Sequence, residues 1–174
     1  MMNLVKKQGI GTWISLGTLL LAIIGLILYG ASVSGGMDLT VANGSEPFYE
    51  ASRPADMTMM SMVVTCGVLS VLFLAAAIVL GQLKLEGLVG TIVNAVAGAM
   101  RIVVPALLLA TMLNYLYGSL TGLAWTLFSN EELEIYAEAI KVGNTVITGV
   151  AFLAISMIAS IVASFFNLTK KTAE

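Results

Sequence analysis

The sequence predicts an all-α integral membrane protein, built as an antiparallel bundle of four transmembrane helices. The chain has 174 residues, of which 59% are hydrophobic and 10% charged, and its mean hydropathy is +0.99. A water-soluble core of this size could not bury so many apolar side chains. Four apolar stretches divide the sequence, each near the roughly 20 residues that cross a hydrocarbon core about 30 Å thick. We therefore expect one transmembrane domain, residues 1–174, with helices at about 10–30, 57–82, 88–118 and 131–168.

Two absences narrow the chemistry that the chain can perform. The sequence contains no histidine, and Cys66 is its single cysteine. These facts exclude an intrachain disulfide, a CxxC redox pair, histidine metal sites and catalysis by Cys-His or Ser-His-Asp groups. A lipid-modifying enzyme would depend on carboxylates, and no spaced acid–base pair supports one. We therefore expect a protein without enzymatic activity or cofactor. Basic stretches suited to nucleic acid are missing too, so we expect no nucleic-acid partner.

The first apolar stretch follows Lys6 and Lys7, as in a signal peptide, but its run from Trp13 to Tyr29 exceeds the usual length of about 7 to 15 residues. It is therefore expected to be an uncleaved transmembrane helix. Small side chains recur on one face at four-three spacing: Gly11, Ser15, Thr18, Ala22 and Gly25. Such a stripe lets another helix approach closely, either in a dimer or inside the chain's own bundle. The second interpretation is favoured because four helices in one chain need such faces.

Residues 31–56 form the longest polar segment and are predicted to be the first outer loop. Gly35, Gly36 and Pro47 interrupt this segment, and residues 37–42 alternate weakly in polarity, as a short strand would. A connection of this length is typical of a folded cap or a partner-binding element. We expect the loop to contact a protein partner.

The second apolar stretch opens with methionines at positions 57, 59, 60 and 62. Met59, Met62 and Cys66 share one helical face, and their soft sulfur atoms suit Cu(I). Methionine is also an ordinary flexible filler, and this interpretation is favoured because a copper site would need a further ligand. A second stripe of small residues follows at Gly67, Ser70, Leu74, Ala77 and Gly81. The short connection over 82–87 makes the second and third helices antiparallel neighbours.

The third apolar stretch contains Arg101, a full charge inside a predicted membrane crossing. If the helix enters the membrane at Leu88, Arg101 lies about 20 Å deep, past the midplane. If Tyr115 and Tyr117 instead mark the far interface, as aromatic belts do, Arg101 lies about 6 to 9 Å from the near edge, within reach of the headgroups. The second placement is favoured because it avoids most of an insertion cost of about 2.5 to 3.5 kcal/mol.

A proline and several polar residues accompany Arg101 on the same helix. Pro105 lacks the amide that would bond the Arg101 carbonyl, which frees a backbone acceptor and predicts a kink. Intramembrane charges usually face a bundle interior or water, so one interpretation is an anion, lipid-headgroup or transport site; the other, which is favoured, is an interfacial anchor. One helical face is predicted to hold Asn94, Gly98, Arg101, Pro105, Leu108 and Met112. The candidate ligand or pathway residues are Arg101, Asn94, Pro105, Thr111 and Asn114.

Residues 118–130 are predicted to be the second outer loop, and the fourth helix is predicted to begin outside the membrane. Ser129 and Glu132 stand in capping-box register. The first turns carry Glu131, Glu132, Glu134 and Glu138, which we interpret as a solvated face because their spacing does not make a calcium loop. The helix therefore starts about two to three turns above the membrane. Its membrane part carries a third stripe: Thr145, Gly149, Ser156, Ser160, Ala163 and Asn167.

The distribution of charge predicts that both termini are cytoplasmic. With this topology the inner segments, counting Arg101, carry a net charge of +4 and the outer segments −6. The inner basic residues are Lys6, Lys7, Lys84, Arg101, Lys170 and Lys171, against Arg53 and Lys141 outside. This excess satisfies the positive-inside rule. We expect the protein in the plasma membrane or the bacterial inner membrane.

Two functions are compatible with the sequence. The first is an accessory, scaffolding or assembly subunit that binds a protein partner through its outer loops. The second is a small transporter or channel, formed by a homo-oligomer around an Arg101 site. The layout of four helices with a long first outer loop resembles that of the claudins and the MARVEL proteins. A claudin loop has paired cysteines, which this chain lacks, so no site residue is carried over from that resemblance.

Overall fold

The computed structural model describes residues 9–43, 54–83, 85–128 and 133–168. Their secondary structure consists of four long helices: α2 (Ile10–Asn43), α3 (Pro54–Leu80), α4 (Gly87–Phe128) and α5 (Leu133–Ser164). Each of these helices contains a segment long and apolar enough to cross a membrane, at Ile10–Val33, Met59–Leu80, Gly87–Leu120 and Ile140–Ser164. The described chain is all-helical and has four helices long and apolar enough to span a membrane, as predicted, which indicates an integral membrane protein.

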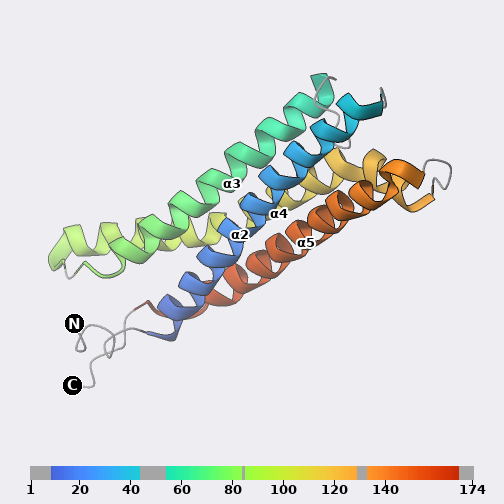
Figure 1. Ribbon diagram of the computed structural model, residues 1–174. Coiled ribbons are helices and arrows are strands. Elements are labelled where there is room, and N and C mark those ends of the chain that lie inside the picture. The colour runs from blue at the N-terminus through green and yellow to red at the C-terminus, as the bar shows by residue number, and fades with distance from the viewer. Residues whose placement is uncertain (1–8, 44–53, 84, 129–132, 169–174) are drawn as a thin grey trace.

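The four helices pack side by side as an antiparallel bundle (Figure 1). α2 packs most closely on α5, α3 on α4, and α4 on α5, whereas α2 and α3 touch each other less. The short connection after α3 thus joins two neighbouring helices, as predicted. Gly87 begins α4 with a φ of +69°, a left-handed conformation that glycine adopts without steric cost. Both ends of the described chain lie at one end of the bundle, where the Gly9 amide donates to the Leu168 carbonyl at 2.9 Å.

The small-residue stripes face the interior of this bundle. On α2, Ser15, Thr18 and Ala22 have 1% of their surface exposed or less, and Gly11 and Gly25 are buried as well. A β-carbon added to Gly25 would lie 2.7 Å from Leu153 Cγ on α5, so glycine permits that approach. The Ser156 hydroxyl donates to the Thr18 carbonyl at 2.9 Å across the same interface. The interpretation of the stripe as packing within one bundle is confirmed.

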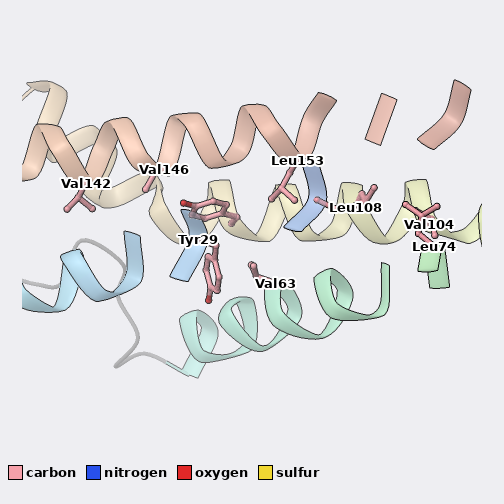
Figure 2. Packing of buried hydrophobic residues seen from close by; sticks show 10 residues of the cluster. Tyr29, Val63, Leu74, Val104, Leu108, Val142, Val146 and Leu153 are labelled. Carbon is pink, nitrogen blue, oxygen red and sulfur yellow. The ribbon is translucent and has the colours of Figure 1, made fainter. Parts of the chain in front are cut away.

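The interior is filled by apolar side chains from all four helices. Val63 and Leu74 from α3, Val104 and Leu108 from α4, and Leu153 from α5 point into this shared core (Figure 2). Val63, Leu108 and Leu153 have no exposed surface. Because side chains from facing helices close the space along the bundle, a single copy of the chain has a packed core along its axis.

The observed bounds of α2 differ from the predicted helix at 10–30. α2 continues to Asn43, through Gly35 and Gly36 and across the predicted strand at 37–42, so the strand prediction is wrong. Two glycines disfavour a helix by about 1 kcal/mol each, but they do not remove hydrogen-bond donors as proline does. No proline occurs between Ile10 and Asn43, and the helix continues past its apolar part.

The other helices also differ at their ends. α3 begins at Pro54, since proline suits the first turn of a helix. α4 continues to Phe128 instead of ending near residue 118. α5 ends at Ser164 instead of residue 168, and the amides of Phe165 and Phe166 close a tight turn onto the carbonyls three residues earlier. The predicted capping box at Ser129 and Glu132 lies outside the described residues, as do Lys6, Lys7, Lys84, Lys170 and Lys171.

Candidate functional site

Arg101 lies on α4 at the level where α5 ends. Its Nη2 donates hydrogen bonds to the carbonyl oxygen of Ala163, in the last turn of α5, and to that of Phe166, at 2.9 Å. The last carbonyls of a helix lack the usual amide four residues later, and the negative end of the helix dipole attracts a cation. The Ala163 carbonyl also accepts a hydrogen bond from the Phe166 amide at 3.1 Å, so Arg101 adds a second donor there. Arg101 therefore acts as a C-terminal cap for α5. Its Nε is buried without a hydrogen-bond partner.

The start of α2 closes the same end of α5. The Thr12 hydroxyl donates to the Leu168 carbonyl at 2.5 Å, and the Gly9 amide donates to the same oxygen. Gln82, just after α3, donates its side-chain amide to the Thr12 hydroxyl at 3.4 Å. Hydrogen bonds thus join parts of α2, α4, α5 and the connection after α3 at one end of the bundle.

A pocket of about 420 Å³ opens beside Arg101. We call it the Arg101 pocket, and its lining consists of Gly81, Asn94, Ala97, Gly98, Arg101, Asn167 and Leu168. Three of these residues have a small side chain or none, which creates the space. Among the described residues that line the pocket, the polar side-chain groups are one guanidinium and two carboxamides, and none is acidic. Such a set of groups donates hydrogen bonds to an anion.

The structure brings together two of the candidate residues and separates the others. Arg101 and Asn94 line the Arg101 pocket. Pro105 is partly buried one turn further along α4. Thr111 is fully buried and donates its hydroxyl to the Leu107 carbonyl at 2.8 Å, whereas Asn114 donates to the Ala110 carbonyl at 2.8 Å. These last two side chains bond their own helix and do not line the pocket.

The buried face of α4 is offset from the predicted one. Its most buried residues are Ala97, Val104, Leu108, Thr111 and Tyr115, and Leu108 alone belongs to both sets. Asn94 is exposed. Arg101 lies level with the ends of α3 and α5, which favours the placement near a membrane edge over the placement past the midplane. Tyr115, however, does not mark an interface.

Tyr115 is a core residue that sequence reasoning misplaced. It has no exposed surface, whereas Tyr117 is 62% exposed. The Tyr115 and Tyr29 rings meet edge to face, with centroids 5.1 Å apart. The Tyr115 hydroxyl lies 2.9 Å from the Ser32 hydroxyl, which itself donates to the Tyr29 carbonyl at 2.8 Å. The sequence offered one signal, the glycine at position 149 in the small-residue stripe of α5. Glycine there makes room for Tyr115, since an added β-carbon would lie 2.8 Å from Tyr115 Cε1.

We expect the hydroxyls of Tyr115 and Ser32 to act as one unit. Tyr115→Phe keeps the ring contact with Tyr29 and removes the hydrogen bond to Ser32 and the longer one to the Leu28 carbonyl at 3.4 Å, which should lower the free energy of unfolding by about 1 kcal/mol. Ser32→Ala should have a similar effect, and the double variant should lose little more than either single variant. Thermal unfolding in detergent micelles measures all three. Fully additive losses would show that the two hydroxyls are not coupled.

The sulfur-containing residues at the start of α3 do not converge on the core. Met62 is 46% exposed and Cys66 is partly buried, while Met59 is also partly buried. Met60, which lay outside the proposed copper set, packs against the core cluster. That contact is what a flexible filler makes.

Comparison of the chain with protein-family models, curated proteins and solved structures finds no match in any of the three.

Proposed function

We propose that this protein is a non-catalytic, multi-pass membrane protein that acts as an accessory, scaffolding or assembly subunit. The observation that carries the proposal is that helices extend into acidic stretches of the sequence at the end opposite the described chain ends. α2 continues through Asp38 to Asn43, instead of ending near residue 30. α3 begins at Pro54, before Asp56, and α5 begins at Leu133, before Glu134 and Glu138. We call residues 31–43, 54–58 and 133–139 the helical extensions.

The helical extensions carry a concentrated negative charge along the sequence. Asp38, Asp56, Glu134 and Glu138 belong to them. Four more carboxylates occur in the two segments that connect these helices: Glu46, Glu50, Glu131 and Glu132. A helical end with one sign of charge suits a basic surface of another protein, since complementary potentials speed and orient association. The expected partner is therefore a protein with a basic face at this side of the membrane.

The packed interior supports a role in assembly over transport by one copy. A pathway needs polar groups or water along the bundle axis. The interior here holds apolar residues such as Val63, Leu108 and Leu153, and the buried hydroxyls of Thr18, Ser70 and Thr111 donate to carbonyls of their own helices. A second candidate function, transport through a homo-oligomer, is favoured by one observation, the Arg101 pocket. The described residues that line this pocket all lie at one end of the bundle, so they do not form a path along the bundle axis.

The orientation belongs to the same proposal. We place both termini in the cytoplasm, because the basic residues near the described chain ends outnumber those of the opposite end. The acidic helical extensions then face the extracytoplasmic side of a plasma membrane or bacterial inner membrane. Cysteine labelling of residues 134 and 172 in intact cells tests this orientation, which requires that a membrane-impermeant reagent reach position 134 alone.

Neutralising the acidic extensions should release the partner without unfolding the bundle. In the triple variant Asp38→Asn, Glu134→Gln and Glu138→Gln, we expect loss of a protein that co-purifies with the wild type in mild detergent. High salt should have the same effect on the wild type, because it screens exposed charges. Quantitative mass spectrometry measures the co-purified protein, and thermal unfolding checks the fold.

Glu86→Gln provides the matched control. This change removes an exposed carboxylate next to α4 at the opposite end of the bundle, and it should leave co-purification intact. The proposal is contradicted if the wild type purifies alone and carries solute flux in proteoliposomes. Flux that disappears with an Arg101→Gln protein shown by thermal unfolding to be folded, but persists with Glu86→Gln, would support the transporter alternative.

A further inference from the structure

We infer that the Arg101 pocket binds a negatively charged phosphate group, as carried by an anionic lipid headgroup or by free phosphate. Such binding involves the pocket alone and does not depend on a protein partner. The first reason for this inference is that the Arg101 guanidinium has no partner of opposite charge among the described residues. The two hydrogen bonds that it donates go to main-chain carbonyls, which have no formal charge. Its Nε is buried and has no partner.

A guanidinium held in this way is only partly compensated. Arg101 is partly buried, and a charge withdrawn from water is more stable when it is paired with an opposite charge. The carbonyls of Ala163 and Phe166 supply hydrogen bonds but leave the positive charge without an anionic partner among the described residues. Phosphate is the anion that matches the planar array of donors on arginine, and its oxygens accept several hydrogen bonds at once.

The lining of the Arg101 pocket matches the same ligand. Its volume of about 420 Å³ falls within the range of about 300 to 1,000 Å³ of small-molecule sites, so it accommodates a headgroup and not only a bare ion. Asn94 and Asn167 place a carboxamide on each side, one from α4 and one from the segment after α5. Ala97 and Leu168 give the pocket an apolar part, where the uncharged portion of a headgroup fits.

The position of the pocket favours a lipid as the source of the phosphate. Its lining includes Gly81 and Leu168, just after the ends of α3 and α5, which is the level at which a spanning bundle meets the headgroups. Exposed apolar residues continue along the chain after α3 and at the start of α4, at Leu83, Leu85, Leu88 and Val89. Lys84, Lys170 and Lys171 follow the lining residues closely in sequence, and basic residues near a membrane surface attract anionic lipids.

Gly98→Leu is the decisive variant. An added β-carbon at Gly98 meets no atom within 4 Å, and Gly98 lines the pocket, so we expect a leucine side chain there to occupy pocket space. The variant leaves Arg101 and its two carbonyl partners unchanged in sequence, so we expect the cap on α5 to be retained. Gly30→Leu is the matched control, since Gly30 also has open space around it on α2 and lies far from the pocket in the bundle.

The experiment measures the shift in thermal unfolding of the full chain in a neutral detergent. The probes are a short-chain phosphatidylglycerol, a short-chain phosphatidylcholine and inorganic phosphate. We expect phosphatidylglycerol to stabilise the wild type and the Gly30→Leu variant. In Gly98→Leu, the phosphatidylglycerol concentration that gives half of the maximal stabilisation should rise about tenfold or more. A tenfold rise corresponds to the loss of binding free energy expected for one charge-assisted hydrogen bond.

The three probes distinguish the sources. Stabilisation by phosphatidylglycerol but not by inorganic phosphate identifies a lipid headgroup, and the reverse result identifies a free anion. Either effect must weaken by about tenfold or more in Gly98→Leu to support the inference. The inference is overturned if none of the probes stabilises the wild type. It is also overturned if phosphatidylcholine acts as strongly as phosphatidylglycerol, or if Gly98→Leu responds like Gly30→Leu.

Discussion

Arg101→Gln is expected to lower the free energy of unfolding by about 3 kcal/mol, because it removes two hydrogen bonds from a charged donor, each worth about 1.5 to 3 kcal/mol. Both bonds close the C-terminal end of α5, at the carbonyls of Ala163 and Phe166. Glutamine is shorter and neutral, so it cannot cap both carbonyls or favour the negative end of the helix dipole. For a chain of this size the loss corresponds to a fall of roughly 6 to 12 °C in the unfolding midpoint.

Two further variants make the Arg101 result specific. Arg101→Lys keeps the charge but replaces the planar donor array by a single ammonium group, so its loss should be intermediate. Lys141→Gln removes an exposed cation at the other end of α5, and a surface change of this kind should stay within about 0.5 kcal/mol. Thermal unfolding in one detergent compares all the variants. An Arg101→Gln midpoint equal to that of Lys141→Gln would show that the cap contributes no stability.

Gly149→Val is expected to lower the free energy of unfolding by about 3 kcal/mol, at the upper end of the cost of overfilling a core. An added β-carbon would lie 2.8 Å from Tyr115 Cε1 and 3.2 Å from Leu28 Cβ. The Tyr115 ring cannot withdraw easily, because it has no exposed surface and is held by Ser32 and the edge-to-face contact with Tyr29. Relief therefore requires that α5 move away from α2 and α4.

Gly30→Val is the matched control for Gly149→Val. Both changes add the same β-branched side chain to a spanning helix, but the β-carbon at position 30 meets no atom within 4 Å. We expect Gly30→Val to keep its unfolding midpoint within the range of neutral surface changes, about 0.5 kcal/mol. Equal midpoints for the two variants would contradict the close approach of α2, α4 and α5 around Tyr115.

The membrane-spanning core of this fold could be predicted from the sequence because its signals are local. Long apolar runs identified four helices, and small residues at four-three spacing identified the faces that pack, as Ser15, Thr18 and Ala22 demonstrate. The helix ends could not be predicted in the same way. Outside the apolar segments, composition does not distinguish a helical turn from a loop. For this reason the continuation of α2 through Gly35 and Gly36 to Asn43 was not predicted.

The candidate site was predicted in part. A charge within an apolar run made Arg101 conspicuous, and Asn94 was placed near it by helical periodicity. The groups that hold Arg101 are main-chain carbonyls of α5, and a carbonyl has no signature in the sequence. Tyr115 was misplaced for a related reason, since an aromatic residue near the end of a span is typical of a membrane interface but also of a core contact such as that with Tyr29.

The close packing of α2 on α5 has a consequence for biosynthesis. These two helices are the first and the last of the four described helices to emerge during translation, which proceeds from the N-terminus. The small, polar face of α2, including Ser15 and Thr18, therefore stays exposed to lipid or to the insertion machinery until α5 is inserted and packs on it. Synthesis that stops after α4 leaves this face without its natural cover, and such a fragment is a ready target for membrane quality control.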